Sequence, residues 1–268
     1  YLFFIGFPLL IFILLRLTEE KKIFLIFLNN LRKVTIKKYK NGLLDFLLII
    51  FISFIFFEFF SIELKPNQID VYHDGQLISS AFKNYQDKSL WSGSYIITGI
   101  FNEMLATKIS WNFFNTLSIG SAKFSFIFLI LINKILLTIF AFQISNNINL
   151  NNIFKCINFL FLFLIFHNLI DYNLGKGDLY NYRELPILLL LLSLPYLISQ
   201  KKSSYIIIFL FGFISLPTLF WSLDRGIIFN LLIFLIIFYF ALIKHFYKVL
   251  TLLISILISW IFFSYLLG

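Results

Sequence analysis

Long apolar runs recur along the whole chain and constrain its fold more than any other feature. A helix needs about 20 consecutive apolar residues to cross a membrane. The runs are continuous rather than alternating, which favours helices. We therefore expect seven or eight spans, near 1–17, 43–61, 119–143, 153–170, 185–199, 204–222, 226–243 and 248–267.

The composition supports the membrane class. Of 268 residues, 60% are hydrophobic and 13% are charged, whereas about a quarter of the residues in a soluble domain are charged. A water-soluble fold, a disordered chain and a nucleic-acid-binding module are therefore excluded. The single cysteine, Cys156, excludes a disulfide framework and a cysteine-built metal site. The fold class predicted is an all-α integral membrane protein, built as a multi-pass helical bundle.

The basic residues predict the orientation, because lysine and arginine gather in cytoplasmic loops. With residues 16–42 in the cytoplasm, alternation of the spans puts 13 basic residues inside and 8 outside, and leaves Lys134 in the membrane. The chain opens on Tyr1 and ends inside an apolar run, so we expect a piece of a longer protein. Residues 1–42 then form an N-terminal span and a basic loop, and residues 43–268 form the membrane module.

The acidic residues are distributed less evenly than the basic ones. In this orientation three carboxylates lie inside and ten outside. Acidic residues barely influence insertion, so this bias predicts a polar working surface on the outer, non-cytoplasmic face. The outer carboxylates are Glu58, Glu63, Asp70, Asp74, Asp87, Glu103, Asp171, Asp178, Glu184 and Asp224.

The segment 62–118 is the largest predicted outer loop. Its parts 77–85 and 96–114 have apolar residues at roughly helical spacing, interrupted by charges. Tryptophans and a tyrosine near the second part suit helices that lie in the membrane interface. We therefore expect amphipathic juxtamembrane helices that rest on the bundle.

One candidate site lies in this loop, at Asp70, His73 and Asp74. In a helix these three residues share one face. Such a face holds a general base with an orienting partner, or a divalent cation, the one cofactor the sequence suggests. The alternative is a solvated loop whose charges cap the next helix.

Two arginines predict a phosphate site at other outer turns. Arg183 is followed by Glu184, and Arg225 follows Asp224. A guanidinium matches a phosphate bidentately, and arginines at the outer ends of spans are well placed for a lipid phosphate. The alternative is that Arg183 pairs with Glu184 or Asp178, and Arg225 with Asp224, as interfacial anchors.

Ionisable residues inside the apolar runs form a third group. Lys134 and Glu58 are costly to bury and are therefore functional candidates. Each has a simpler explanation, because Glu58 lies within a turn of the interface and a lysine can snorkel. We expect His167 to be a satisfied interfacial histidine rather than a ligand.

Three stretches are similar to one family of enzymes: His73-Asp74-Gly75, Trp91-Ser-Gly-Ser-Tyr-Ile-Ile-Thr-Gly-Ile-Phe101 and Trp221-Ser-Leu-Asp-Arg-Gly226. Together with the long outer loop after a span, they make roughly 43–268 resemble the multi-pass glycosyltransferases of the C-type fold (GT-C) of a bacterial group. These enzymes use polyprenyl-phosphate-linked sugars on the non-cytoplasmic face.

The resemblance implies an inverting hexosyl- or pentosyltransferase in the bacterial inner membrane. Its catalytic carboxylate would be Asp74, with His73 beside it and Asp70 as a second carboxylate or metal ligand. The donor would be a polyprenyl-phosphate sugar, and the acceptor is not specified. By chemistry rather than by family, Arg225 and Arg183 would receive the donor phosphate, and the predicted substrate site also includes Asp224 and Glu103.

Two other functions fit the sequence. Lys134 and Glu58 at membrane depth, with Pro195, Gly212 and Pro217 interrupting spans, are also typical of a transporter or flippase for a lipid-linked or anionic solute. A surface-polysaccharide polymerase or ligase would also use outer arginines on a lipid phosphate. The sequence contains no Gly-rich phosphate loop, zinc-protease motif or serine-hydrolase motif.

Overall fold

The computed structural model describes residues 42–62, 73–87, 99–148, 150–169, 183–198 and 203–267. The side chains of a few residues within these ranges, among them His73, Asp74 and Glu103, are outside the description. The described residues form ten α-helices and one π-helical segment, and they contain no strand. The predicted all-α class is therefore confirmed for this part of the chain.

Four of the described helices are long and apolar enough to cross a membrane: α3 (Gly42–Phe60), α6 (Ile119–Asn147), α11 (Leu223–Leu242) and α12 (Phe246–Leu267). The apolar helices α7 (Asn152–Leu169) and α8 (Leu185–Ile198) are shorter. The expected span 1–17 and the basic loop that follows lie outside the described residues. The structure therefore supports the membrane class with four candidate spans, fewer than the seven or eight expected.

The run 204–222, expected as one span, is not one continuous helix. This run forms two helices, α9 (Ser203–Phe213) and α10 (Ser215–Trp221), with a break at Ile214. The physical reason is Pro217, whose ring nitrogen carries no hydrogen to donate to the carbonyl of Phe213. A proline is tolerated in the first turn of a helix, so a new helix begins just before it.

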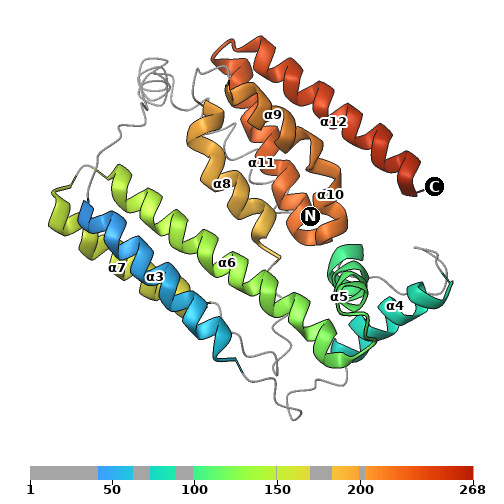
Figure 1. Ribbon diagram of the computed structural model, residues 1–268. Helices are drawn as coiled ribbons and strands as arrows, with labels where there is room; N and C mark the ends of the chain where they lie inside the picture. Colours follow the sequence, from blue (N-terminus) through green and yellow to red (C-terminus); the bar gives the residue numbers. More distant parts are fainter. Residues whose placement is uncertain are drawn as a thin grey trace, which may run out of the picture. The chain divides into compact units, whose positions relative to one another are not determined.

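Helices α3, α6 and α7 pack against one another (Figure 1). The ring of Phe51 stacks on that of Phe163, with centroids 4.0 Å apart. Leu44 clusters with Ala141 near one end of this packing, and Ile55 clusters with Leu131 further along. Since the numbers rise in one helix as they fall in the other, α3 and α6 run antiparallel.

Helices α8 to α12 form a second group of packed helices (Figure 1). Its core contains fully buried aromatic and aliphatic side chains from α8, α9, α11 and α12. Small residues allow α9 and α12 to approach closely. A Cβ added to Gly212 would meet the hydroxyl of Ser255 and lie 3.0 Å from the carbonyl oxygen of Leu252, so the Ser255 side chain would have to move to admit a larger residue.

The predicted outer loop contains three helical segments: α4 (His73–Asp87), the π-helical η2 (Phe101–Leu105) and α5 (Ala106–Phe114). The expected helix over 96–114 is thus described from residue 100 onward. Lys108 of α5 donates to the Asn84 amide oxygen of α4 over 2.6 Å and ties the two helices together. One side of α4 is buried at Ala81 while Phe82 beside it is exposed, as expected for an amphipathic helix.

The turn between α5 and α6 is fixed by polar contacts. Asn115 ends α5 in the left-handed conformation, with φ of 51°. The indole nitrogen of Trp111 donates to the carbonyl of Ser118 over 2.9 Å, and the Ser118 hydroxyl caps α6 by accepting from the amide of Ser121. This turn sets α5 across the beginning of α6.

Candidate functional site

The break between α10 and α11 exposes a helix N-terminus that carries two charges. Ser222 is extended, with φ of −158°, and α11 begins at the next residue. The Asp224 carboxylate accepts from the Ser222 hydroxyl and, over 2.9 Å, from the amide of Arg225. A carboxylate in the first turn of a helix is stabilised by the amides that it accepts from. Asp224 is therefore held in place by the backbone around it.

Arg225 joins this helix end to the segment before α8. Its Nε lies 2.6 Å from Oε1 of Glu184, and its Nη1 lies 3.3 Å from Oδ2 of Asp224. One guanidinium thus contacts two carboxylates from positions 41 residues apart. All three side chains are partly exposed, so another anion could reach the guanidinium.

Arg183 lies deeper in the same region. It is only 3% exposed, and its guanidinium interacts electrostatically with the Asp224 carboxylate. We call Arg183, Glu184, Asp224 and Arg225 the arginine cluster. It balances two positive charges against two negative ones, so displacing one carboxylate would leave a net positive site.

Hydrogen bonds from the side chain of Asn230 hold α10 against α11 next to the arginine cluster. The side-chain amide of Asn230 donates to the carbonyls of Ser215 and Gly226, over 2.9 Å and 2.8 Å. A Cβ on Gly226 would lie 2.5 Å from the carbonyl oxygen of Thr218. The backbones of α10 and α11 are therefore in contact directly after Arg225. This contact fixes the position of the Arg225 backbone, from which the side chain extends.

An aromatic pair connects the arginine cluster to the outer loop. The ring of Phe101 stacks on Trp221, with centroids 4.2 Å apart and planes within 12°. Gly99 has φ of +146°, and a Cβ there would lie 2.7 Å from the carbonyl oxygen of Trp221. Only glycine suits this close approach. Gly99 therefore lies directly against the backbone of Trp221 and Ser222.

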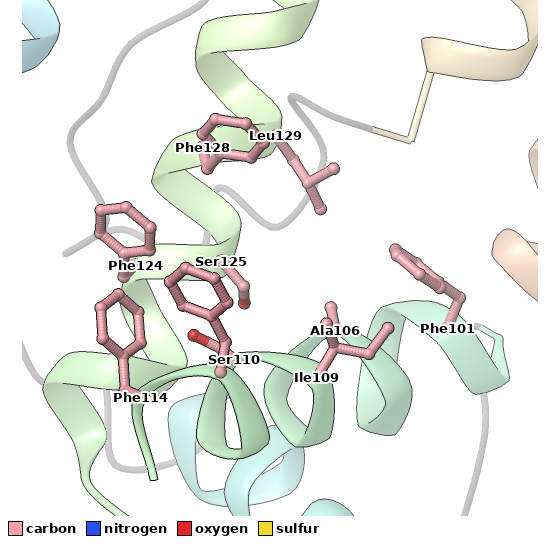
Figure 2. Close-up of a pocket in the computed structure, with 10 residues that line it drawn as sticks. Phe101, Ala106, Ile109, Ser110, Phe114, Phe124, Ser125, Phe128 and Leu129 are labelled. Atoms are coloured by element: carbon pink, nitrogen blue, oxygen red, sulfur yellow. The ribbon is translucent and has the colours of Figure 1, made fainter. Parts of the chain in front are cut away.

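Beyond Phe101 an apolar cavity of about 430 Å³ lies between α5 and α6. Figure 2 shows Phe124 and Phe128 of α6 facing it from one side, and Ala106 and Ile109 of α5 from the other. Its polar lining is limited to two serine side chains. We call it the aromatic cavity; its lining residues are Phe101, Ala106, Ile109, Ser110, Phe113, Phe114, Phe124, Ser125, Phe128 and Leu129.

The aromatic cavity and the arginine cluster share one apolar core. Leu185, which follows Glu184 directly, is buried with Ala106 of the cavity wall and with Phe126 and Ile127 of α6. Phe101 and Trp221 pack against the same core. A charged site and an apolar cavity are therefore linked through a continuous set of packed side chains.

The structure brings together only part of the predicted site. Arg183, Asp224 and Arg225 meet in one cluster, and Arg225 pairs with Asp224, the contact given above as the alternative to a phosphate site. Sequence reasoning missed that Glu184 accepts from Arg225, and it gave no role to Phe101 or Trp221. Its remaining site calls lie outside the described residues: Asp70 and the partner residue Asp178 entirely, and His73, Asp74 and Glu103 by their side chains.

The two intramembrane candidates form an ion pair with each other. The Lys134 ammonium lies 3.1 Å from both carboxylate oxygens of Glu58. The Lys134 side chain is only 2% exposed, so its ammonium is enclosed by the packed helices, and the explanation by snorkelling stays a prediction. His167 lies beside this pair, with its Nε2 3.8 Å from Oε2 of Glu58. The expectation of a merely interfacial histidine did not include this contact.

The metal hypothesis stays a prediction. Within the ranges that the structure describes, no group of three histidine, cysteine, aspartate or glutamate side chains is placed to hold a metal ion. The predicted ligands Asp70, His73 and Asp74 are among the side chains outside those ranges.

Comparison of the chain with protein-family models, with curated proteins and with solved structures finds no match. The resemblance to GT-C glycosyltransferases therefore stays a prediction.

Proposed function

We propose that the protein is a membrane glycosyltransferase that transfers a sugar from a polyprenyl-phosphate donor to an acceptor on the non-cytoplasmic face. The observation that carries this proposal is the link between the arginine cluster and the aromatic cavity through Phe101 and Trp221. A polyprenyl phosphate combines one anionic group with a long apolar chain. It needs a cationic site next to an apolar one, and the two lie together here.

Arg225 is the residue that would receive the donor phosphate. Its Nε and Nη1 already contact carboxylate oxygens of Glu184 and Asp224, and a guanidinium binds carboxylate and phosphate in the same fork geometry. A phosphate that replaces Glu184 would accept from Nε of Arg225 and would keep Arg183 nearby as a second positive charge. Both charges would favour departure of the phosphate, where negative charge develops.

The proposed reaction also needs a base, and the resemblance assigns that role to Asp74. The acceptor oxygen attacks the anomeric carbon while Asp74 takes its proton. The bond from the anomeric carbon to the phosphate oxygen breaks, and the phosphate keeps the electron pair. Attack from the opposite face inverts the anomeric centre. Asp70 and His73 remain candidates for orienting Asp74.

The proposal includes the finer membrane architecture. In it α7, α8 and the broken pair α9–α10 cross the membrane beside the four longer helices, which gives eight spans together with residues 1–17. A helix broken at membrane depth is tolerated where other helices cover the free backbone groups. The Asn230 contacts with α10 support this arrangement. We place the protein in the bacterial inner membrane.

Sugar transfer from a synthetic polyprenyl-phosphate sugar tests the proposal. We expect Arg225→Gln to lower kcat/KM by about 100-fold or more, as for the loss of other groups that stabilise transition-state charge, and Arg225→Lys to recover part of it. Arg32→Gln in the basic loop is the matched control and should keep full activity. Full activity in Arg225→Gln, or in both Asp74→Asn and Asp74→Ala, would contradict the assigned roles.

A proton-coupled transporter is the second candidate, because the ionisable side chains of Glu58, Lys134 and His167 come from three packed helices and contact one another. The two functions predict different results in proteoliposomes. Movement of an anionic or lipid-linked solute without a covalent product would favour the transporter. Transfer of many sugars into one long product would instead favour the polysaccharide polymerase or ligase.

A further inference from the structure

A cluster of three ionisable side chains joins α3, α6 and α7 away from the arginine cluster. Glu58 of α3 accepts from the Lys134 ammonium of α6 at both of its oxygens, each over 3.1 Å. His167 of α7 places its Nε2 3.8 Å from the same carboxylate. We call these residues the charge triad. None of them is used in the proposed sugar transfer.

The charge balance of the triad depends on His167. With a neutral imidazole, Glu58 and Lys134 form a pair without net charge, which is the least costly state in an apolar bundle. One proton on the imidazole makes the triad cationic, and Glu58 then faces two positive groups. Histidine is the side chain that changes charge near neutral pH. The state of His167 therefore sets the net charge of the triad.

Two aromatic rings hold the imidazole beside Glu58. The ring of Phe163, one turn earlier in α7, stacks on it with centroids 5.4 Å apart and planes within 17°. Phe54 of α3 lies against it at 5.5 Å. A separation of 3.8 Å from Glu58 is longer than a hydrogen bond. The contact therefore gains most of its attraction when the ring is protonated.

Other charges on the packed helices lie far along their axes. At 1.5 Å per residue, the nearest described charges on α3, α6 and α7 are about 16 to 20 Å from the triad member on the same helix. Lys108 of α5 is bonded to Asn84, and α8 carries no charged residue. Asp171, four residues after His167, is outside the described residues. The other ionisable groups on α3, α6 and α7 are Asp45, Lys123, Lys155 and the thiol of Cys156. Of these, Lys123 adjoins Phe124, whose ring contacts that of Phe59 beside Glu58.

The triad lies close to two helix ends. Glu58 is two residues before the end of α3 at Phe60, and His167 is two residues before the end of α7 at Leu169. Both side chains are partly exposed, whereas Lys134 is buried. The two partly exposed members of the triad therefore lie near helix ends, and Lys134 is its buried member.

We infer that Glu58, Lys134 and His167 form a proton-binding site within the α3–α6–α7 packing. A ring nitrogen of His167 takes one proton from the medium with its lone pair, and the resulting imidazolium shares the Glu58 carboxylate with Lys134. No other bond is made or broken. The site is independent of the proposed sugar transfer, since it requires neither the donor nor Arg225.

Nitrogen-15 NMR of histidine-labelled full-length protein in nanodiscs tests this inference. The His167 signal is assigned by its loss in His167→Gln and followed between about pH 5 and pH 9. We expect one titration. Its midpoint should move by about one pH unit or more to lower pH in Glu58→Gln, which removes the attracting carboxylate, and to higher pH in Lys134→Met, which removes the repelling ammonium.

Two further variants control for folding and for unspecific effects. Glu58→Gln combined with Lys134→Gln leaves no unpaired charge, and we expect the His167 midpoint to lie between those of the two single variants. His245→Gln is the matched control and should leave the His167 midpoint in place. The inference is overturned if His167 does not titrate, or if the midpoint stays unchanged in both single variants or moves the same way in both.

Discussion

Two buried lysines show how a single charged residue can complete a helix. Lys155 donates to the carbonyl of Asn146 near the end of α6, and Lys248 donates to that of Leu197 near the end of α8, each over 2.9 Å. The last carbonyls of a helix lack backbone partners and carry partial negative charge. Both lysines therefore satisfy a carbonyl group at a helix end. This role is separate from any contribution they make to the excess of basic residues in the loops.

Lys248 gives a prediction about stability at this scale. Its ammonium also lies over the ring of Phe240, 5.0 Å from the centroid. Lys248→Met keeps the length of the side chain and leaves the Leu197 carbonyl without this donor. We expect a loss of about 1 to 3 kcal/mol in the free energy of unfolding, as for other hydrogen bonds to charged groups.

Chemical unfolding in detergent measures this loss. Lys244→Met is the matched control, because Lys244 is exposed and lies in the turn between α11 and α12, four residues before Lys248; its free energy of unfolding should change by less than about 0.5 kcal/mol. Equal effects in the two variants would show that the Leu197 contact contributes nothing.

At the scale of elements, the apolar runs predicted most helices within a few residues. The run 43–61 became α3, and 119–143 became the first 25 residues of α6. Pro217 indicated an interruption of the run 204–222, but the exact break at Ile214 was not predicted, because hydropathy does not register hydrogen bonds. Pairing between elements was beyond the sequence: Glu184 and Arg225 are 41 residues apart, and nothing local indicates that they meet.

The packing of α10 on α11 gives a prediction at this scale. In Gly226→Ala the new methyl group would meet the backbone of Thr218 and Leu219 at about 2.6 Å or less, so the helices must separate. We expect a loss of about 1 to 3 kcal/mol in stability. We also expect weaker donor binding, because Arg225 would move relative to Glu184.

Gly120→Ala is the matched control for this variant. A Cβ on Gly120 meets no atom within 4 Å, and alanine in a helix is better than glycine by about 0.5 to 1 kcal/mol. Thermal unfolding should therefore show opposite signs for the two substitutions. A stable and fully active Gly226→Ala would mean that the arginine cluster does not depend on this close approach.

At the scale of the whole molecule, the sequence predicted the membrane class and the presence of amphipathic helices after the first described span. It did not predict that this loop packs at Phe101 and Gly99 against residues 120 positions later. That contact depends on a flat aromatic stack and on a positive φ, which three-dimensional packing selects. The charge bias that predicts sidedness is a property of the whole chain and needs a test at that scale.

Cysteine labelling provides that test in a Cys156→Ala background. The proposed topology puts Lys83→Cys and Lys176→Cys outside, and Lys33→Cys and Lys202→Cys inside. An impermeant maleimide is added to cells whose outer envelope layers have been removed while the membrane that contains the protein stays intact. It should label the first pair only. The second pair should react after the membrane is opened.

Labelling at positions 176 and 202 tests whether α8 crosses the membrane, as the proposed topology requires. Only α8 is described between them, and its 14 residues extend about 21 Å at 1.5 Å per residue, against a hydrocarbon core of about 30 Å. Opposite labelling requires the flanking residues or a thinned bilayer to make up the difference. Labelling from the same side would show that α8 does not cross. Labelling of position 83 from the cytoplasm would remove the non-cytoplasmic donor site, because α4 belongs to the loop that contains Asp74.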